Sequence, residues 1–198
     1  MALAQVFEQV YATDISAKQI EHAAKAINIT YSIAPAEHTS FGNQTFDLIT
    51  VAQAIHWFNF DHFFAEVKRT LKPDGFFAAI GYGLMTIDSE LDEVIFKLYE
   101  TILGEYWDPE RKHIEQNYDT ISFPFQPIAA PNLTITTKWD FNQLIGYLET
   151  WSALQHYLKA NGSNPIKLVN DELKKAWGTD EFKTVNFPLI IKAGRLNG

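Results

Sequence analysis

Four stretches of the chain place polar or aromatic side chains directly after apolar runs of strand length. Ligands of open α/β sheets bind at the carboxyl ends of the strands, so these stretches are candidates for one shared site. A carboxylate in such a position can accept hydrogen bonds from both hydroxyls of a ribose. The candidate residues are Asp14 with Ile15, Ala36 with Glu37, Gln53 and Ala54 with His56 and Trp57, and Tyr82 between Gly81 and Gly83.

Each candidate also has a plainer interpretation when it is taken alone. Asp14 could be a solvated acid between a strand and a helix, and His56 could be either a general base or a hydrogen-bonded core histidine. The six histidines are scattered singly along the chain, so we expect no metal site. A G-x-S-x-G elbow and a P-loop are both absent from the sequence, which disfavours a hydrolase triad and a nucleotide triphosphatase.

The composition narrows the class of protein. A chain of 198 residues with 46% hydrophobic and 20% charged residues has the composition of one globular domain with a small subdomain. The formal net charge of −8 would repel a phosphate backbone, so we expect no nucleic-acid partner. Because no apolar stretch approaches the length of a membrane span, we expect no membrane partner and a cytoplasmic location. The chain has no cysteine, which excludes disulfides and thiolate metal sites.

Apolar runs alternate with helical patterns through the first part of the chain. Ser16 and Gln19 form an S-x-x-Q capping box, and the apolar stripe behind it extends to Ile27. Residues 72–75, Lys-Pro-Asp-Gly, predict a tight turn. Short connections between alternating strands and helices favour a mostly parallel sheet wrapped by helices. The expected strands cover residues 9–14, 29–33, 46–51 and 76–82, and a helix is expected over 61–71.

The second half of the chain changes to long helical patterns. Apolar residues from Ile87 to Leu103 predict one long amphipathic helix, and the proline-punctuated stretch 107–131 is interpreted as a loop or lid. Strands are expected over 133–139 and 185–191, and helices over 141–158 and 164–177. The predicted domains are a core over 1–83, a helical lid and acceptor region over 84–183 with one core strand near 133–139, and a C-terminal core strand within 184–198.

Several of these stretches together resemble a known family. Those in the first half read DIS at 14–16, VAQAIHWF at 51–58 and EVKRTLKPDGFFA at 66–78. Those in the second half read EYWDPERKHIEQNYDTISFPF at 105–125, YLETWSALQHY at 147–157 and FPLIIKAGR at 187–195. Over nearly its whole length the chain is similar to class I S-adenosylmethionine-dependent methyltransferases, and most similar to the branch that includes trans-aconitate and cantharidin methyltransferases.

The resemblance implies a Rossmann-like sheet with a helical lid or insert in the C-terminal half, S-adenosylmethionine as cofactor, and a small-molecule acceptor. A carboxylate acceptor is already ionised at pH 7 and needs a cation to orient it rather than a strong base. The implied cofactor-binding residues are Asp14, Ile15, Ala36, Glu37, Gln53 and Ala54. His56 and Arg111 are the catalytic candidates, with Lys112, His113 and Arg195 as further cations. The expected acceptor pocket is lined by Trp57, Tyr82, Tyr106, Trp107 and Trp151.

Two features depart from the family pattern. The first glycine of the sequence is Gly42, so the family's first strand and its G-x-G-x-G turn are missing ahead of Asp14. Pro35 stands where many relatives have an acid that helps to hold the adenine amine. The missing strand would lie between the strands expected at 9–14 and 46–51, and their open edges predict association, for example as a homodimer. We therefore expect a truncated methyltransferase core, inactive if these residues are the whole protein.

Two other functions remain open at this stage. A non-catalytic methyltransferase remnant could act as a binding or oligomerisation module. A nicotinamide-binding oxidoreductase would also place an acid after its second strand, but the absence of a glycine fingerprint and the AIHWF stretch argue against it.

Overall fold

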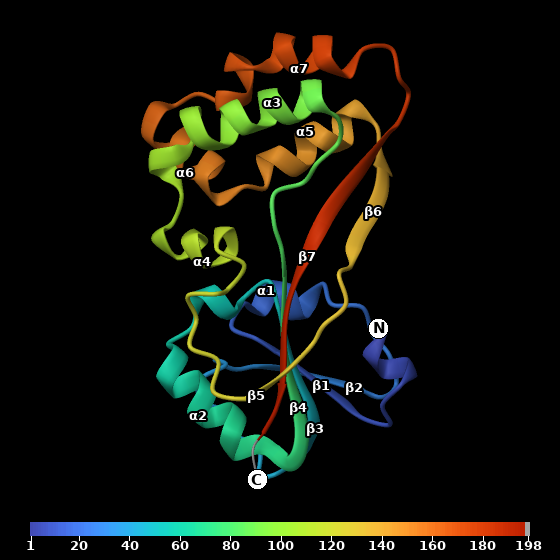
Figure 1. Cartoon of the computed structure of the whole chain (residues 1–198), viewed down its shortest axis with the longest axis vertical. Helices are drawn as coiled ribbons and strands as arrows, with labels where there is room; N and C mark the ends of the chain where they lie inside the picture. The colour runs from blue at the N-terminus through green and yellow to red at the C-terminus, as the bar shows by residue number, and fades with distance from the viewer. Residues whose placement is uncertain (197–198) are drawn as a thin grey trace. The chain divides into compact units, whose positions relative to one another are not determined.

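A computed structural model describes residues 1–196 of the chain, and these residues form two compact units (Figure 1). The first unit comprises residues 1–79 and 121–129 together with the described residues from Lys192 onward. The second unit comprises residues 80–120 and 130–191. The strands β4 (Leu71–Tyr82) and β7 (Lys183–Arg195) contribute residues to both units.

The first unit begins with a two-stranded parallel sheet. Strand β1 (Val10–Asp14) pairs in register with β2 (Ile29–Ile33), and the helix α1 (Ala17–Glu21) connects the two. The short 3-10 helix η1 (Leu3–Gln5) precedes β1. Both strands were expected at these positions, and the parallel pairing agrees with the predicted α/β class.

A second sheet has five strands in the order β3-β4-β7-β5, with β6 pairing with β7 off this path. Strands β5 and β6 both run antiparallel to β7, so the sheet is mixed rather than wholly parallel. The bounds are β3 (Phe46–Ala52), β5 (Gln126–Ile128) and β6 (Thr134–Trp139). The α/β fold is therefore confirmed, with a C-terminal antiparallel part.

The two sheets do not join through β1 and β3. Among the described residues β1 pairs as a strand only with β2, and β3 is the end strand of its own sheet. Side chains rather than backbone connect the two strands, because the rings of Tyr11 and Phe46 lie 5.8 Å apart and both contact Phe41. Strand β3 was expected to be covered on both faces, but only Val51 in it is buried, since it lies at the end of the sheet.

The helix α1 is much shorter than its sequence pattern suggests. The side chain of Ser16 accepts a hydrogen bond from the backbone of Gln19, as the capping box predicts, but the helix ends after Glu21. Ile27, expected on a buried stripe, is fully exposed. The stripe fails because helices are stabilised mainly by packing of their apolar face, and no side chain among residues 1–50 is buried.

The helix α2 (Phe60–Thr70) supplies the main packing of the first unit. Asn59 caps it by accepting a hydrogen bond from the backbone of His62. Phe63 and Phe64 pack against Phe77 of β4, so the predicted helix and its apolar face are both confirmed. The Lys72–Gly75 stretch, expected to form a tight turn, belongs instead to the continuous strand β4.

The second unit is a helical cluster that packs on β6 and the adjoining part of β7. It contains a buried apolar core that includes Leu91, Ile95, Leu144, Leu148 and Leu173. The single long helix expected up to Leu103 is α3 (Ser89–Phe96) followed by a π-helix, η3 (Lys97–Ile102). The other helices of the second unit are η4 (Gly104–Tyr106), η5 (Pro109–Arg111), α4 (Lys112–Glu115), α5 (Phe141–Glu149), α6 (Ser152–Asn161), η6 (Pro165–Leu168) and α7 (Asn170–Trp177).

Candidate functional site

The carboxyl ends of β1 and β2 lie side by side. Asp14 and Ile33 are paired in the ladder, and the backbone N–H of Ala34 donates to the carbonyl oxygen of Asp14 at 3.2 Å. The loop that carries Ala36 and Glu37 therefore leaves the sheet directly beside Asp14. The first two sequence-predicted strand ends are thus brought together.

The carboxylate of Asp14 has a fixed direction. Its Oδ1 accepts a hydrogen bond of 2.7 Å from the backbone of Ser16, the residue that caps α1. Asp14 is half-buried, while the neighbouring Ile15 is 78% exposed. An oriented carboxylate beside an accessible apolar side chain fits the ribose and the adenine face of an adenosyl group.

The third strand end is held in an unusual backbone conformation. Gln53, which directly follows β3, has a φ of 51°, in the left-handed region that residues other than glycine rarely adopt. Such strain costs about 1–3 kcal/mol and is concentrated at functional sites. Glu37 accepts a hydrogen bond of 3.0 Å from the backbone of Asn59, which ties the loop after β2 to the segment between β3 and α2. The residues expected to hold the adenosyl group therefore lie on neighbouring loops of the first unit.

His56 and Trp57 have opposite environments in the 3-10 helix η2 (Ile55–Trp57). The ring of His56 is buried, whereas Trp57 is 54% exposed, and the two ring centroids are 4.9 Å apart. Trp57 can therefore contact a ligand directly. His56 lies beneath it as a packed residue, in a position that better suits support of Trp57 than proton transfer.

In the second unit, Arg111 lies among aromatic rings. Its guanidinium carbon is 4.8 Å from the ring centroid of Trp107 and 5.5 Å from that of Tyr99. The Nε of Arg111 donates to the Tyr99 hydroxyl at 3.0 Å, and Arg111 is half-buried. The rings of Trp107 and Trp151 are 5.5 Å apart, so two of the expected pocket residues lie beside this cation.

Two tyrosines that the sequence analysis did not single out, Tyr118 and Tyr147, also interact electrostatically with Arg111. Burial raises the pKa of Tyr118 to about 12 and also raises the pKa of Tyr147, and in both cases the positive charge of Arg111 opposes the shift. The hydroxyls around Arg111 are therefore neutral at pH 7, a combination that suits an anion with further hydrogen-bonding atoms.

The remaining candidates lie elsewhere. The ring of Tyr106 contacts that of Tyr157, with the centroids 4.9 Å apart and the planes inclined by 59°. The Tyr106 hydroxyl accepts from Asn161, so Tyr106 packs on α6 rather than on Arg111. The guanidinium of Arg195 lies 4.7 Å from the ring centroid of Phe76 in the first unit. The Nδ1 of His113 lies 2.7 Å from the Thr120 hydroxyl oxygen, and burial lowers its pKa. Lys112 is exposed.

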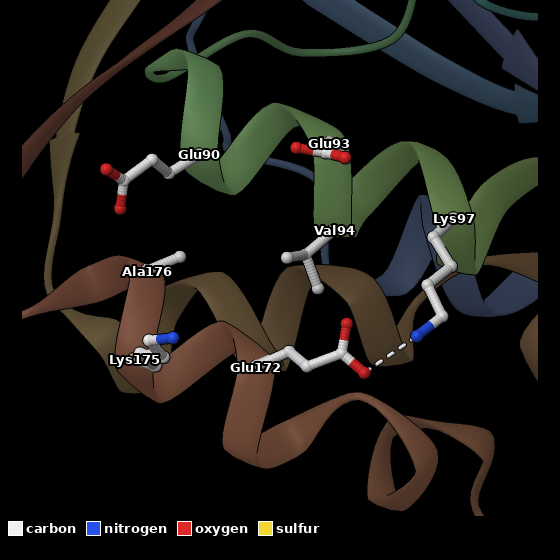
Figure 2. A pocket seen from close by; sticks show the side chains of 7 residues that line it. All are labelled: Glu90, Glu93, Val94, Lys97, Glu172, Lys175 and Ala176. Atoms are coloured by element: carbon white, nitrogen blue, oxygen red, sulfur yellow. Dashed lines mark hydrogen bonds and ion pairs between the residues drawn. The ribbon is translucent and has the colours of Figure 1, made fainter.

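A separate groove of about 460 Å³ lies between α3 and α7 (Figure 2). Glu172 of α7 pairs with Lys97 of η3 across it at 2.7 Å. The other lining residues are Glu90, Glu93, Val94, Lys175 and Ala176. The groove includes none of the candidate site residues, and we assign it no ligand.

Among residues 1–196 no group of three or more His, Cys, Asp or Glu side chains is arranged to hold a metal ion. No helix in the same range is both long and apolar enough to span a bilayer.

Known proteins with similar sequences and structures identify the family. A family model described as a methyltransferase domain matches residues 1–79. A protein of Dictyostelium discoideum assigned as a methyltransferase is 36% identical over 196 residues, which cover 96% of this chain and 74% of that protein. CRG1 of Saccharomyces cerevisiae, assigned as an S-adenosylmethionine-dependent methyltransferase, is 25% identical, with coverage of 94% and 76%.

Among solved structures, a type II methyltransferase assigned in Anaeromyxobacter dehalogenans is 41% identical, with a TM-score of 0.90 and coverage of 98% of this chain and 83% of that chain. These similarities extend over both units. The chain belongs to the S-adenosylmethionine-dependent methyltransferases, and S-adenosylmethionine is its cofactor.

Proposed function

We propose that this methyltransferase methylates a carboxylate oxygen of a small molecule, in the manner of the trans-aconitate and cantharidin methyltransferase branch. The observation that supports the proposal is the half-buried Arg111, whose guanidinium lies over the ring of Trp107 and donates to the neutral hydroxyl of Tyr99. A guanidinium can bind a carboxylate through two parallel hydrogen bonds. In the described chain only the Nε of Arg111 is used by a protein acceptor, so its Nη groups can serve a substrate.

Methyl transfer to a carboxylate requires no covalent intermediate with the protein. S-adenosylmethionine supplies an electrophilic methyl group on a sulfonium. A carboxylate oxygen forms the new C–O bond while the C–S bond breaks, its electron pair stays on sulfur, and no proton is transferred. The protein must therefore hold the acceptor in line and exclude water. We assign the first task to Arg111 and the second, within the second unit, to the aromatic residues Trp107 and Trp151.

On the cofactor side, we propose that Asp14 accepts hydrogen bonds from the ribose hydroxyls and that Ile15 covers the adenine. Gln53, Ala54, Ala36 and Glu37 supply the neighbouring polar groups. Replacement Asp14→Asn removes the charge but keeps the shape. Its affinity for S-adenosylhomocysteine is expected to fall by about tenfold, the value of one hydrogen bond to a charged group.

Calorimetric titration checks that affinity. Asp47→Asn is the control, because Asp47 pairs with Lys72 on the surface, and its affinity should not change. Equal affinities for Asp14→Asn and the unsubstituted protein would remove Asp14 from the cofactor site.

The acceptor class is tested by methyl transfer from S-adenosylmethionine to a panel of mono-, di- and tricarboxylates. Arg111→Gln is expected to lower kcat/KM by about 100-fold or more, mainly through KM, because the carboxylate loses its charged partner. Lys112→Gln is the control for charge alone, since Lys112 is exposed. Efficient methylation of a nitrogen or carbon acceptor, with no turnover of any carboxylate, would contradict this acceptor class.

A second candidate function is a non-catalytic module that associates through its strands. The observation that favours it is that β1 and β3 each pair on one edge only among the described residues. Unpaired strand edges can add another strand, including one from a second copy of the chain. Failure of S-adenosylhomocysteine to bind at millimolar concentration would favour this function. A monodisperse monomer in sedimentation would count against association.

A further inference from the structure

We propose that Tyr99 is a positioning residue that aims Arg111 at the acceptor. This inference rests on the proposed role of Arg111. Tyr99 lies in the π-helix η3, a conformation that occurs mostly as single turns and often at functional sites. Its ring is buried and contacts Trp107 at 4.7 Å and Trp151 at 5.7 Å.

The Tyr99 hydroxyl links two charged residues. It accepts a hydrogen bond from the Nε of Arg111 and donates its own proton to Oε1 of Glu115. A hydroxyl has one proton, so donation to Glu115 turns its lone pairs toward Arg111. Burial and the bond to Glu115 raise the pKa of Tyr99 to about 12, which keeps the hydroxyl protonated at neutral pH.

The guanidinium is thereby fixed in two ways. One face of Arg111 lies on the ring of Trp107, and the Nε edge is held by Tyr99. Trp107 is itself held, because its Nε1 donates to the carbonyl oxygen of Tyr99 at 3.0 Å. A planar fork that is fixed at one face and one edge presents its two Nη groups in a single direction. Orientation before binding reduces the conformational entropy that the substrate would otherwise have to offset.

The variant Tyr99→Phe tests this role because it removes only the hydroxyl and keeps the buried ring. We expect the dissociation constant of the carboxylate to rise about tenfold, while the affinity for S-adenosylhomocysteine stays unchanged. Binding is followed without cofactor by the fluorescence of Trp107 and Trp151, with acetate, succinate and citrate as probes. KM in methyl transfer should rise more than kcat falls, since the change concerns orientation of the acceptor.

Three further variants separate positioning from a general structural effect. Glu115→Gln retains a side-chain oxygen that can accept from Tyr99, so it should bind carboxylate nearly as the unsubstituted protein does, whereas Glu115→Ala should resemble Tyr99→Phe. Tyr157→Phe removes the hydroxyl of a half-buried tyrosine on α6 that contacts Tyr106, and it should change nothing. In an Arg111→Gln background, Tyr99→Phe should have no further effect, because the two residues act as one unit.

The outcomes distinguish this inference from the proposed function. If Arg111→Gln weakens carboxylate binding but Tyr99→Phe does not, the positioning role is wrong and the function stands. If Arg111→Gln has no effect, or if none of the three probes changes the fluorescence of the unsubstituted protein, both are wrong. Additive losses in the double variant would show that Tyr99 acts independently of Arg111, which also overturns the inference.

Discussion

The first 50 residues and the helical cluster of the second unit differ sharply in how many of their side chains are buried. No side chain in residues 1–50 is buried, although that stretch carries two strands, a helix and the proposed ribose-binding acid. In the helical cluster, Leu91, Ile95, Leu144, Leu148 and Leu173 are all wholly inaccessible to solvent. The difference indicates that the helical cluster carries most of the packing energy, while the strands of the first 50 residues are held by backbone pairing and a few side-chain contacts.

Replacing the same residue type in the two regions gives the largest expected contrast. Ile95→Ala opens a cavity in the helical cluster and should lower the free energy of unfolding by about 2–5 kcal/mol. Ile27→Ala removes a side chain that has no buried surface, so the change should be within about 0.5 kcal/mol. Urea unfolding followed by circular dichroism measures both. Equal losses would mean that Ile27 is buried in solution and that the contrast is false.

Close packing in the second unit can be tested at one glycine. A Cβ at Gly81 would overlap the hydroxyl oxygen of Tyr118 and would lie 2.8 Å from its Cζ. The Tyr118 ring is buried and its backbone is left-handed with a φ of 60°, so it has little freedom to move. Gly81→Ala should cost about 1–3 kcal/mol. Thermal unfolding measures it against Gly104→Ala, where the added Cβ meets nothing within 4 Å.

A small loss of stability in Gly81→Ala would contradict the close packing around Tyr118. If Gly81→Ala costs no more than Gly104→Ala, the Tyr118 ring is not confined, and its place beside β4 does not depend on the missing Cβ.

An ion pair between Glu66 and Arg69 connects α2 to the loop before β3 in the first unit. Glu66 of α2 accepts from Nε and Nη2 of Arg69, at 2.8 and 2.7 Å, and from the backbone of Thr39 at 2.8 Å. Arg69 also donates to the carbonyl oxygen of Phe41. The loop before β3 is thereby attached to α2. The hydrogen bond from Arg69 is the main cause that lowers the pKa of Glu66 to about 2.

This contact predicts a dependence of stability on pH. Because the folded state favours the ionised form of Glu66, its stabilisation is complete above the ordinary pKa of 4.5 and is lost as the pH falls toward 2. Glu66→Gln should therefore destabilise the protein by about 1–3 kcal/mol at pH 7 and by much less at pH 2.5. Urea unfolding at both pH values measures this. A difference that does not depend on pH would exclude the carboxylate as its source.

The smallest expected effect concerns the response to ligand. Since residues 1–50 have little burial, their amides in β1 and β2 should exchange with solvent faster than those of α5. Saturating S-adenosylhomocysteine should slow amide exchange mainly around Asp14 and Gln53. The factor by which exchange slows should equal the factor by which ligand binding stabilises the folded state. Hydrogen exchange with mass spectrometry measures it. Protection confined to the second unit would place the cofactor elsewhere.

The sequence predicted those elements whose apolar pattern matches their packing. The helix α2 was predicted within one residue at each end because its apolar stripe is indeed covered, by Phe77 among others. The helix α1 was predicted too long because the same kind of stripe, ending at Ile27, has nothing to cover it. Periodicity reports which residues could be buried, and burial itself depends on partners far along the chain.

The candidate site was predictable only in part, because local residue patterns do not show which side chains the fold brings together. Asp14 and Arg111 lie in stretches whose residue types resemble the methyltransferase family. Tyr118 and Tyr147 also lie in such stretches, but their local pattern marks no role, because one follows a left-handed Asn117 in an irregular stretch and the other lies on an ordinary amphipathic helix. Their proximity to Arg111 arises from tertiary packing, which no local pattern encodes.

The π-helix η3 makes the chain unusually sensitive to length at one place. A π turn contains an extra residue compared with an α turn, and each residue of an α-helix accounts for a rotation of about 100°. Deleting one residue from Glu100–Ile102 would let the segment continue α3 as a regular helix while turning Tyr99 away from Arg111. A single-codon deletion here would thus move Tyr99 relative to Arg111 with little loss of helix, so a change of one residue in length at this turn would alter the surroundings of Arg111.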